Sequence, residues 1–301
     1  MKKIFKIILA VIVALLIGAG IYGVVVYHDV KNTSDKIYQT KGKVTNKRYV
    51  NVSLDDKQPF SVLLMGTDTG DFGRHEKGRT DTMILATVNP EEKQTNMLSI
   101  PRDTLVTLPK YGGSKINAAY TYGGIPLAVD TIQKEFDIPV DYYVLINMRG
   151  LKQLVNAVDG ITVNNKLDFK FGGHHFKKGK IKLNGDEALK YSRMRHDDPR
   201  GDFGRQLRQQ QVIEAILQKA MSIRMLTKYN SFLKVIGDNM KTNLTLQDMN
   251  KIQNNYRSAN HFKNNQIESE EQRINNLLFQ VISDATFKQT SDELKAQLFI
   301  E

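Results

Sequence analysis

A run of 20 uncharged residues near the amino terminus, residues 7–26, most restricts how this chain can be arranged. At about 1.5 Å per residue, a helix of that length spans roughly the 30 Å hydrocarbon layer of a membrane. A cleaved signal peptide usually has a shorter apolar part, and the small residues Gly18, Ala19 and Gly20 lie inside the run, not after it. The run therefore predicts an uncleaved transmembrane signal anchor.

The charges around this run indicate how the chain lies in the membrane. Lys2, Lys3 and Lys6 precede it, although four lysines soon after it weaken the positive-inside contrast. We expect residues 1–6 to form a short cytoplasmic tail, and the bulk of a single-pass chain to lie outside the cell membrane. Residues 27–58 are polar and charged, which is typical of an extracytoplasmic linker.

Beyond residue 58 the hydrophobic pattern alternates between strands and helices. Short apolar runs bounded by turn residues predict strands at 61–66, 82–88, 96–100, 142–146 and 161–163. Helical spacing predicts helices at 116–122, 127–136, 151–158, 184–191, 213–220, 244–256 and 271–285. This alternation predicts an α/β fold, in which helices flank a central mixed β-sheet in three layers of α-β-α type.

The composition points to an acidic partner. The chain has 43 lysines and arginines against 32 aspartates and glutamates, a formal charge of +11. Such a charge suits nucleic acid, an anionic membrane surface, or a phosphorylated polymer or lipid. The sequence has no cysteine, which excludes disulfides, thiolate zinc sites and cysteine nucleophiles. Nucleic acid is the weakest candidate, because no recognition-helix motif is present and the anchor would place the domain outside the cell.

Polar motifs stand next to three of the predicted strands. They are Gly66-Thr67-Asp68, Arg79-Thr80-Asp81 and Pro101-Arg102-Asp103, followed by Lys115 and Asn117. A single aspartate at a strand end is more often a turn or cap residue. Loops at strand ends are, however, where binding sites are usually built, and aspartate and arginine alternate through all of these motifs. The set therefore predicts a shared site.

A fourth stretch, residues 193–210, reads RMRHDDPRGDFGRQLRQQ and contains five arginines but no lysine. The plainer interpretation is a helix start with local ion pairs. Arginine used alone indicates instead that its planar fork is needed, and that fork fits carboxylate and phosphate oxygens. Arginines combined with carboxylates suit a phosphate site with Mg²⁺, which takes oxygen ligands. The chain lacks the G-x-x-x-x-G-K-[ST] loop of ordinary nucleotide-binding enzymes.

In their order along the chain, these motifs resemble those of the LytR-CpsA-Psr family. The resemblance covers residues 60–222 and rests on Gly66-Thr67-Asp68, Arg79-Thr80-Asp81, Ser99-Ile100-Pro101-Arg102-Asp103, Lys115-Ile116-Asn117-Ala118-Ala119-Tyr120, and Arg193-x-Arg195 through Gln210. It implies a membrane-anchored extracytoplasmic phosphotransferase of cell-wall assembly. Such enzymes transfer a glycopolymer, as sugar 1-phosphate, from a polyprenyl pyrophosphate carrier to peptidoglycan, with the aid of Mg²⁺. The family fold is an α/β sandwich with an apolar tunnel for the polyprenyl tail.

The resemblance also implies roles for individual residues. Asp68, Asp81 and Arg102 would be catalytic, and the two aspartates would bind Mg²⁺, either one being able to serve as base. Pyrophosphate would be held by Arg79, Arg102, Lys115, Arg193, Arg195, Arg205 and Arg208. Supporting roles fall to Asp103, Asn117, Asp202 and Gln209.

The resemblance leaves some features open. Residues 59–222 would form the catalytic domain, and residues 223–301 a C-terminal helical extension of open role. The chain departs from the family at Asp159-Gly160, where two glycines are common, and at Asn147, where an acidic residue is expected. Neither the polymer (teichoic acid, capsule or another wall glycan) nor the acceptor hydroxyl follows from the sequence.

A second interpretation is a membrane-tethered binder or regulator that recognises an anionic envelope polymer without chemistry. The net basic charge alone would support it. It predicts salt-sensitive binding spread over many lysines, with no need for Mg²⁺ or for any one aspartate. If the chain is an enzyme, Asp81→Ala and Arg102→Ala are instead each expected to abolish transfer.

Overall fold

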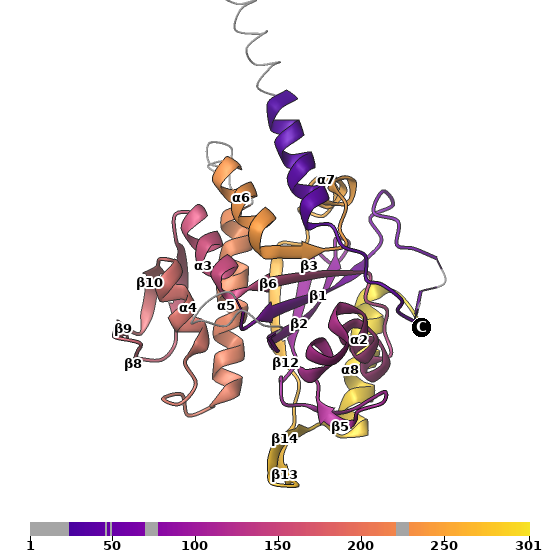
Figure 1. Ribbon diagram of the computed structural model, residues 1–301, viewed down its shortest axis with the longest axis vertical. Helices are drawn as coiled ribbons and strands as arrows, with labels where there is room; N and C mark the ends of the chain where they lie inside the picture. The colour runs from indigo at the N-terminus through magenta and orange to yellow at the C-terminus, as the bar shows by residue number, and fades with distance from the viewer. Residues whose placement is uncertain (1–23, 46, 49, 70–77, 221–228) are drawn as a thin grey trace, which may run out of the picture.

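The computed structural model describes residues 24–45, 47–48, 50–69, 78–220 and 229–301, and within them a mixed six-stranded sheet forms the centre of the molecule (Figure 1). Its strands, in the order in which they lie across the sheet, are β11 (Met240–Thr242), β6 (Tyr142–Asn147), β1 (Phe60–Thr67), β2 (Thr80–Asn89), β3 (Gln94–Ser99) and β12 (His261–Gln266). β1 is antiparallel to β2 and parallel to β6, and β12 is parallel to β3. The predicted α/β class and central mixed sheet are confirmed.

The remaining elements surround this sheet. The paired short strands are β4 (Leu105–Leu108) with β5 (Gly112–Lys115), β7 (Ile161–Asn165) with β10 (Gly179–Leu183), β8 (Phe169–Phe171) with β9 (His174–Phe176), and β13 (Glu270–Ile274) with β14 (Leu277–Val281). The helices are α2 (Ala118–Phe136), α3 (Met148–Ala157), α4 (Gly185–Arg193), α5 (Asp202–Ala220), α6 (Tyr229–Asn239), α7 (Leu246–Asn255) and α8 (Asp284–Leu298). Residues 24–37 are also helical.

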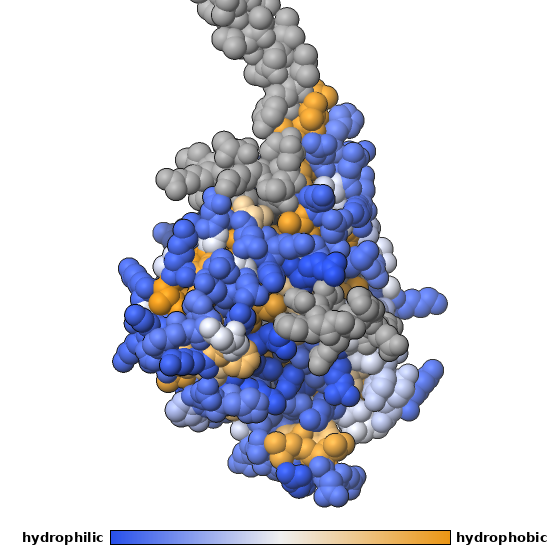
Figure 2. Space-filling model, turned by 60° about the vertical axis from the view of Figure 1, so that its left-hand side comes forward, coloured by the Kyte–Doolittle hydropathy of each residue, from blue (hydrophilic) through white to orange (hydrophobic). Residues whose placement is uncertain are grey.

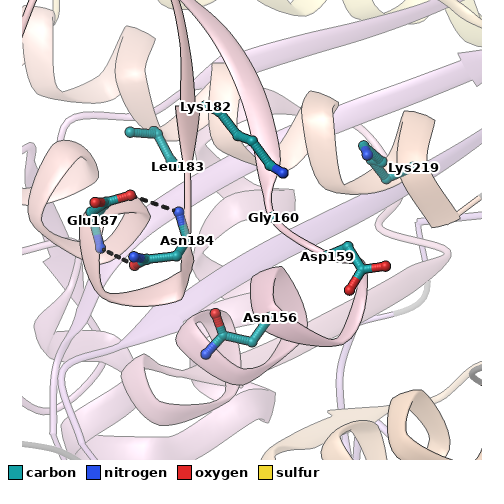
Figure 3. Close-up of a pocket in the computed structure, with 8 residues that line it drawn as sticks. All are labelled: Asn156, Asp159, Gly160, Lys182, Leu183, Asn184, Glu187 and Lys219. Atoms are coloured by element: carbon teal, nitrogen blue, oxygen red, sulfur yellow. Dashed lines mark hydrogen bonds between the residues drawn. The ribbon is translucent and has the colours of Figure 1, made fainter.

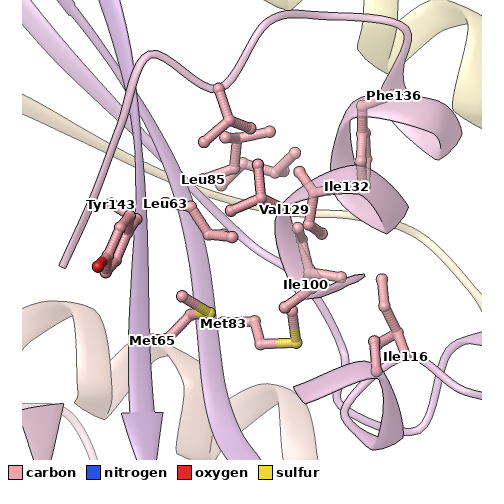
Figure 4. Close-up of a cluster of buried hydrophobic side chains, with 14 of the residues drawn as sticks. Leu63, Met65, Met83, Leu85, Ile100, Ile116, Val129, Ile132, Phe136 and Tyr143 are labelled. Atoms are coloured by element: carbon pink, nitrogen blue, oxygen red, sulfur yellow. The ribbon is translucent and has the colours of Figure 1, made fainter. Parts of the chain in front are cut away.

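Helices α2 and α8 cover one face of the sheet. Leu63 and Met65 are two residues apart in β1 and so point to the same face, where they are almost fully buried. They belong to one apolar cluster with Leu85 of β2 and with Val129 and Ile132 of α2 (Figure 4). The period of two along β1 therefore decides which residues meet α2.

The opposite face of the sheet packs against α5 and α7. Phe60 of β1 points to this face, and its ring lies 5.1 Å from that of Tyr256, at an edge-to-face angle. Gln210 of α5 is fully buried, and its side-chain amide donates to the carbonyls of Met97 in β3, at 3.0 Å, and Asn265 in β12, at 2.8 Å. These bonds fix α5, which carries much of the arginine stretch, onto the sheet.

Two predicted elements differ from the structure. The helices expected at 116–122 and 127–136 form one helix, α2, with a break at Gly124, whose φ is +66°. The prediction of a helix at 271–285 is wrong, because most of these residues form the β13–β14 hairpin. Asn275 and Asn276 have φ of +49° and +62°, as a tight two-residue hairpin turn requires. Their apolar neighbours pair across the hairpin at positions that also match helical spacing.

Residues 223–301 do not form a helical extension, because their described part contributes strands to the central sheet. β11 pairs with β6 at one edge and β12 pairs with β3 at the other. The helix expected at 244–256 is confirmed as α7, with Thr245 as its N-cap. The C-terminal region therefore completes the fold that positions the site.

Much of the expected linker, residues 27–58, packs against the domain. The helix through residue 37 buries Ile37 to 1 % exposure, and the backbone N–H of Gln39 donates to the carbonyl of Thr242 at 2.7 Å. Further on, Arg48 makes a bidentate ion pair with Asp141, at 2.8 and 3.0 Å. We call the described residues 38–45 and 47–48 the N-terminal strap.

The transmembrane span expected at residues 7–26 lies, apart from residues 24–26, outside the described residues. Within the described ranges, no helix has both the length and the apolar character needed to cross a bilayer.

Candidate active site

One cavity of about 550 Å³ gathers most of the predicted site residues. Eight of them line it: Asp68, Arg79, Asp81, Arg102, Arg193, Arg195, Arg205 and Gln209. The sheet explains why. Because β2 is antiparallel to β1, Thr67 at the end of β1 pairs with Thr80 at the start of β2. β3 is antiparallel to β2, so its end, followed by the loop of Arg102, reaches the same edge.

Asp81 and Arg102 form the centre of this cavity. The Nη1 atom of Arg102 lies 2.8 Å from Oδ1 of Asp81, and their side chains are 19 % and 25 % exposed. Burial alone would lower the pKa of Arg102, but the carboxylates of Asp81, Asp103 and Asp202 together outweigh it and raise the pKa. At the cavity edge, Oδ1 of Asp68 accepts from the backbone N–H of Arg79 at 3.1 Å.

Arg205 is the most deeply placed arginine of the cavity. Its side chain is 7 % exposed, and Nη2 lies 2.8 Å from a carboxylate oxygen of Asp202. Burial lowers its pKa, and the nearby charges of Arg102 and Arg195 add to this effect. Because an arginine stays charged in a protein, the lowered pKa means that the cavity favours an added anion.

Two buried guanidinium nitrogen atoms also lack hydrogen-bond partners among the described residues. Within the described part of the chain, the Nε atoms of Arg102 and Arg205 have no hydrogen-bond partner. A buried donor without a partner is costly, so both guanidinium groups have hydrogen-bonding capacity that the protein itself does not use. The five lining arginines also outnumber the two lining aspartates, so the cavity is positive overall.

Three of the expected supporting residues, together with Lys115, lie behind the cavity. The Lys115 ammonium is 2.7 Å from Oδ1 of Asp103, whose other oxygen is 3.6 Å from Nε of Arg102. The backbone N–H of Asn117 donates to the carbonyl of Arg102 at 3.3 Å. Asp202 pairs with Arg205, as described above. Lys115 thus contacts Asp103 and does not line the cavity.

Arg208 also does not line the cavity. Its side chain is 4 % exposed, and its guanidinium bonds to Asp198 at 2.6 Å and to the carbonyl of Tyr191 at 3.1 Å. A further bond reaches the carbonyl of Met194. The fork of Arg208 is therefore occupied in holding the segment between α4 and α5, which carries Arg195.

Several lining residues were missed by the sequence analysis. One wall is apolar, and it consists of Ile146, Met148, Leu151, Phe171 and Leu189. The polar residues that were missed are Thr82, Ser192 and His196, whereas Thr67 belongs to a predicted motif. Asn147, noted only as a departure from the family, also lines the cavity, and its side chain caps α3 by accepting from Gly150 N–H at 2.8 Å.

A shallower hollow of about 660 Å³ lies near the end of α3 and contains none of the predicted site residues (Figure 3). Its polar groups have structural roles. Asn184 and Glu187 cap α4 reciprocally, at 2.9 and 3.0 Å, and Asn156 accepts from the N–H of Gly185 at 2.7 Å. We therefore place the site in the arginine cavity.

Mg²⁺ fits the donor chemistry of the arginine cavity. Among the described residues, no group of three or more histidine, cysteine, aspartate and glutamate side chains is arranged to hold a metal. Mg²⁺ does not need one, because it commonly takes one or two carboxylates together with phosphate oxygens and water. Asp68 and Asp81 provide two carboxylates in a single cavity.

A positive cavity beside an apolar wall defines a class of protein that binds amphipathic anions, with a charged head and an apolar tail. The surface is strongly hydrophilic in the middle of the face seen in Figure 2. The chain belongs to the LytR_cpsA_psr family, which it matches over residues 24–296. The match extends beyond the 60–222 covered by the motifs and includes most of the C-terminal region.

Known relatives agree in sequence and structure. The chain is 47 % identical over 299 residues to the polyisoprenyl-teichoic acid–peptidoglycan teichoic acid transferase TagU of Enterococcus faecalis, covering 99 % of this chain and 98 % of that one. It is similar to the crystal structure of Bacillus subtilis TagU, with 41 % identity, a TM-score of 0.65, and 80 % and 97 % coverage. It is also similar to TagT bound to LI-WTA, with 29 % identity, a TM-score of 0.72, and 88 % and 100 % coverage.

Proposed function

We propose that this chain is a cell-wall phosphotransferase that moves a teichoic acid glycopolymer, as sugar 1-phosphate, from a polyprenyl pyrophosphate carrier to peptidoglycan. One observation carries the assignment to this cavity. Five arginines, two of them with buried Nε atoms that make no hydrogen bond in the described part of the chain, meet two aspartates beside an apolar wall. A pyrophosphate bound to a polyprenyl chain needs such an arrangement, and the Enterococcus faecalis relative is named as a transferase of teichoic acid from a polyisoprenyl carrier to peptidoglycan.

The donor's two ends would occupy different parts of the cavity. The pyrophosphate would lie against Arg102 and Arg205, with Arg79, Arg193 and Arg195 around it. The start of the polyprenyl chain would lie along the apolar wall, where each buried methylene contributes about 0.8 kcal/mol. Arg208 would act differently from the original expectation, by positioning the segment that carries Arg195.

The reaction replaces the phosphoanhydride bond of the donor pyrophosphate with a phosphodiester bond to the acceptor. The acceptor hydroxyl oxygen forms a bond to the phosphorus next to the donor sugar, and the bond from that phosphorus to polyprenyl phosphate breaks. Asp68 or Asp81 accepts the hydroxyl proton, and polyprenyl phosphate leaves with the bridging electron pair. Arg102 and Arg205 stabilise the charge that develops on the phosphoryl oxygens, and this stabilisation is the main source of rate in phosphoryl transfer. Mg²⁺ bound by Asp68 and Asp81 would supply further charge neutralisation.

We also propose that residues 7–26 anchor the chain as a single-pass membrane helix. The amino terminus would be cytoplasmic and the domain extracytoplasmic, so that the domain faces both the lipid-linked donor and peptidoglycan. The apolar, charge-free run supports this placement. Helices on both faces of the sheet agree with the three-layer arrangement expected from the sequence.

The full chain in detergent provides the test. It would be incubated with a lipid-pyrophosphate-linked glycan and a peptidoglycan oligomer, with and without Mg²⁺, and the coupled product measured by mass spectrometry. We expect Mg²⁺-dependent coupling that Arg102→Ala abolishes. Arg200→Ala is the matched control, because this arginine belongs to the same motif but does not line the cavity. Tight donor binding without product from any acceptor would support the non-catalytic binder instead.

A further inference from the structure

A second cavity, of about 350 Å³, adjoins the arginine cavity. Of the residues that the structure describes, Arg195 and His196 alone line both cavities. The second is bounded by the loop after β3, by the segment before α5, and by the β13–β14 hairpin. Its hairpin residues are Glu271, Leu278, Phe279 and Gln280, and we call it the hairpin cavity.

The hairpin is held firmly against the loop that carries Arg102. The backbone N–H of Gln280 donates to the carbonyl of Asp103 at 2.9 Å, and Gln280 also forms a bridge with Thr104. The Lys115 ammonium, already bound to Asp103, lies 5.7 Å from the centre of the Phe279 ring. A ligand in the hairpin cavity would therefore be held at a fixed position relative to Arg102.

The walls of the hairpin cavity differ in charge from those of the arginine cavity. Asp198 and Asp202 face it, but both are paired with arginines of α5. Asp103, paired with Lys115, and Glu271 add two further carboxylates. Arg195 is the one lysine or arginine among the described residues that line the cavity. A polyanionic chain would gain little here, because the cavity has no surplus of positive charge.

The remaining groups suit a neutral saccharide. Glu271 and Gln280 face each other across the hairpin and together offer carboxylate and amide groups to hydroxyls. Leu278 and Phe203 offer apolar surface for the C–H face of a sugar ring. The lower end of the molecule, where the hairpin lies, shows an apolar patch next to hydrophilic surface (Figures 1 and 2).

We propose that the hairpin cavity binds the glycan of the acceptor, a role that rests on the proposed function of the arginine cavity. In a phosphoryl transfer, the attacking and leaving oxygens lie roughly in line with the phosphorus. The leaving polyprenyl phosphate extends along the apolar wall, on the side of α3 and α4. The acceptor must then approach from another side of the arginines, and the hairpin cavity opens there, past Arg195 and His196.

Two pairs of neighbouring residues provide matched tests. Leu277 and Leu278 are adjacent and both exposed, at 57 % and 38 %, but only Leu278 lines the cavity. Glu270 and Glu271 are likewise adjacent and exposed, and only Glu271 lines it. Leu278→Lys and Glu271→Ala are the test variants, and Leu277→Lys and Glu270→Ala their controls. Thermal melting of each full-length variant would confirm that it is folded.

The transfer assay would be run at saturating donor with varied acceptor, and then the reverse. We expect both test variants to raise the KM for the peptidoglycan oligomer on the order of tenfold, with the KM for the donor unchanged and the controls like wild type. A rise in the donor KM alone would place the glycan of the donor in the hairpin cavity. No change in either KM would show that the hairpin cavity has no role in binding the acceptor. Either result overturns the assignment of the hairpin cavity to the acceptor but leaves the proposed transferase function intact. A wild-type chain that forms no coupled product would overturn both.

Discussion

Asp198 is the buried carboxylate on which the arginine segment depends, and Asp198→Ala tests that dependence directly. Its side chain is 1 % exposed and lies 2.6 Å from Nη1 of Arg208, which is 4 % exposed. Removing the carboxylate leaves a guanidinium buried without its counter-ion. Breaking one side of such a pair costs about 3–5 kcal/mol. That is a large share of the roughly 5–15 kcal/mol by which a native protein is stable.

The double variant Asp198→Ala/Arg208→Met separates charge from hydrogen bonding. Apolar replacement of a buried ion pair is often close to neutral. Arg208 also donates to the carbonyls of Tyr191 and Met194, however, and orphaning each would cost about 1–3 kcal/mol. We therefore expect the double variant to regain only part of the lost stability. Arg200 pairs with the same carboxylate at 3.4 Å but is 51 % exposed, so Arg200→Ala should cost less than about 1 kcal/mol.

Urea unfolding followed by circular dichroism measures these differences, and the transfer assay shows their effect on function. We expect Asp198→Ala to lower the transfer rate as well, because the segment that it holds carries Arg195. A loss of less than about 1 kcal/mol in Asp198→Ala, or an equal loss in Arg200→Ala, would contradict the role of Asp198 as the counter-ion of Arg208.

Three further predictions concern other parts of the molecule. Arg102→Lys keeps the charge but loses the fork, so kcat/KM should fall about 10- to 100-fold, from about 1.5–3 kcal/mol for one charged hydrogen bond. Gly204→Ala should destabilise the fold in urea titration, because a Cβ there would lie 1.8 Å from Oδ2 of Asp198. Hydrogen bonds from Lys47 and a second lysine lower the pKa of Asp137 to about 2 from 3.8, so its contribution to stability is present above pH 3.8 and is lost as the pH falls through about 2. Asp137→Asn should flatten the pH dependence of unfolding in that window, and an unchanged profile would contradict this assignment.

The convergence of the aspartate and arginine motifs could be predicted, because each motif directly follows or precedes a strand. Antiparallel pairing of β1 with β2 then brings Asp68 and Asp81 to the same edge of the sheet. Helical spacing also places Gln209 one turn after Arg205, and both line the cavity. Both relationships depend only on residues that are close together in the sequence, so they can be predicted from it.

The role of Arg208 could not be predicted in the same way. It follows Arg205 by three residues, a rotation of about 300° around the helix, so the two lie near each other without having to point the same way. Only the packing of α5 on α4 shows that Arg208 turns toward buried Asp198. The apolar wall was missed for a related reason, since a half-buried Phe171 or a buried Leu189 has no sequence signal that distinguishes it from a core residue.

The β13–β14 hairpin shows how two periodicities can coincide. Ile274, Leu277, Leu278 and Val281 match helical spacing, yet Ile274 pairs directly with Leu277 across the turn. The Asn275-Asn276 dipeptide was the available signal, because asparagine tolerates the positive φ that this turn needs. Propensity for the turn, and not the apolar pattern, decided the structure.

The N-terminal strap is hydrogen-bonded to the domain and is therefore not a free linker. Lys41 donates to the carbonyl of Val140 at 2.7 Å, and Gln39 accepts from the Tyr143 hydroxyl at 2.6 Å, so the helix of residues 24–37 leaves the domain in one direction. If this helix continues from the membrane anchor, the mouth of the arginine cavity has a set height and heading above the bilayer. Encounter with a lipid-borne donor then becomes a search in two dimensions, whereas a long flexible linker would spread the same domain through a hemisphere and dilute it.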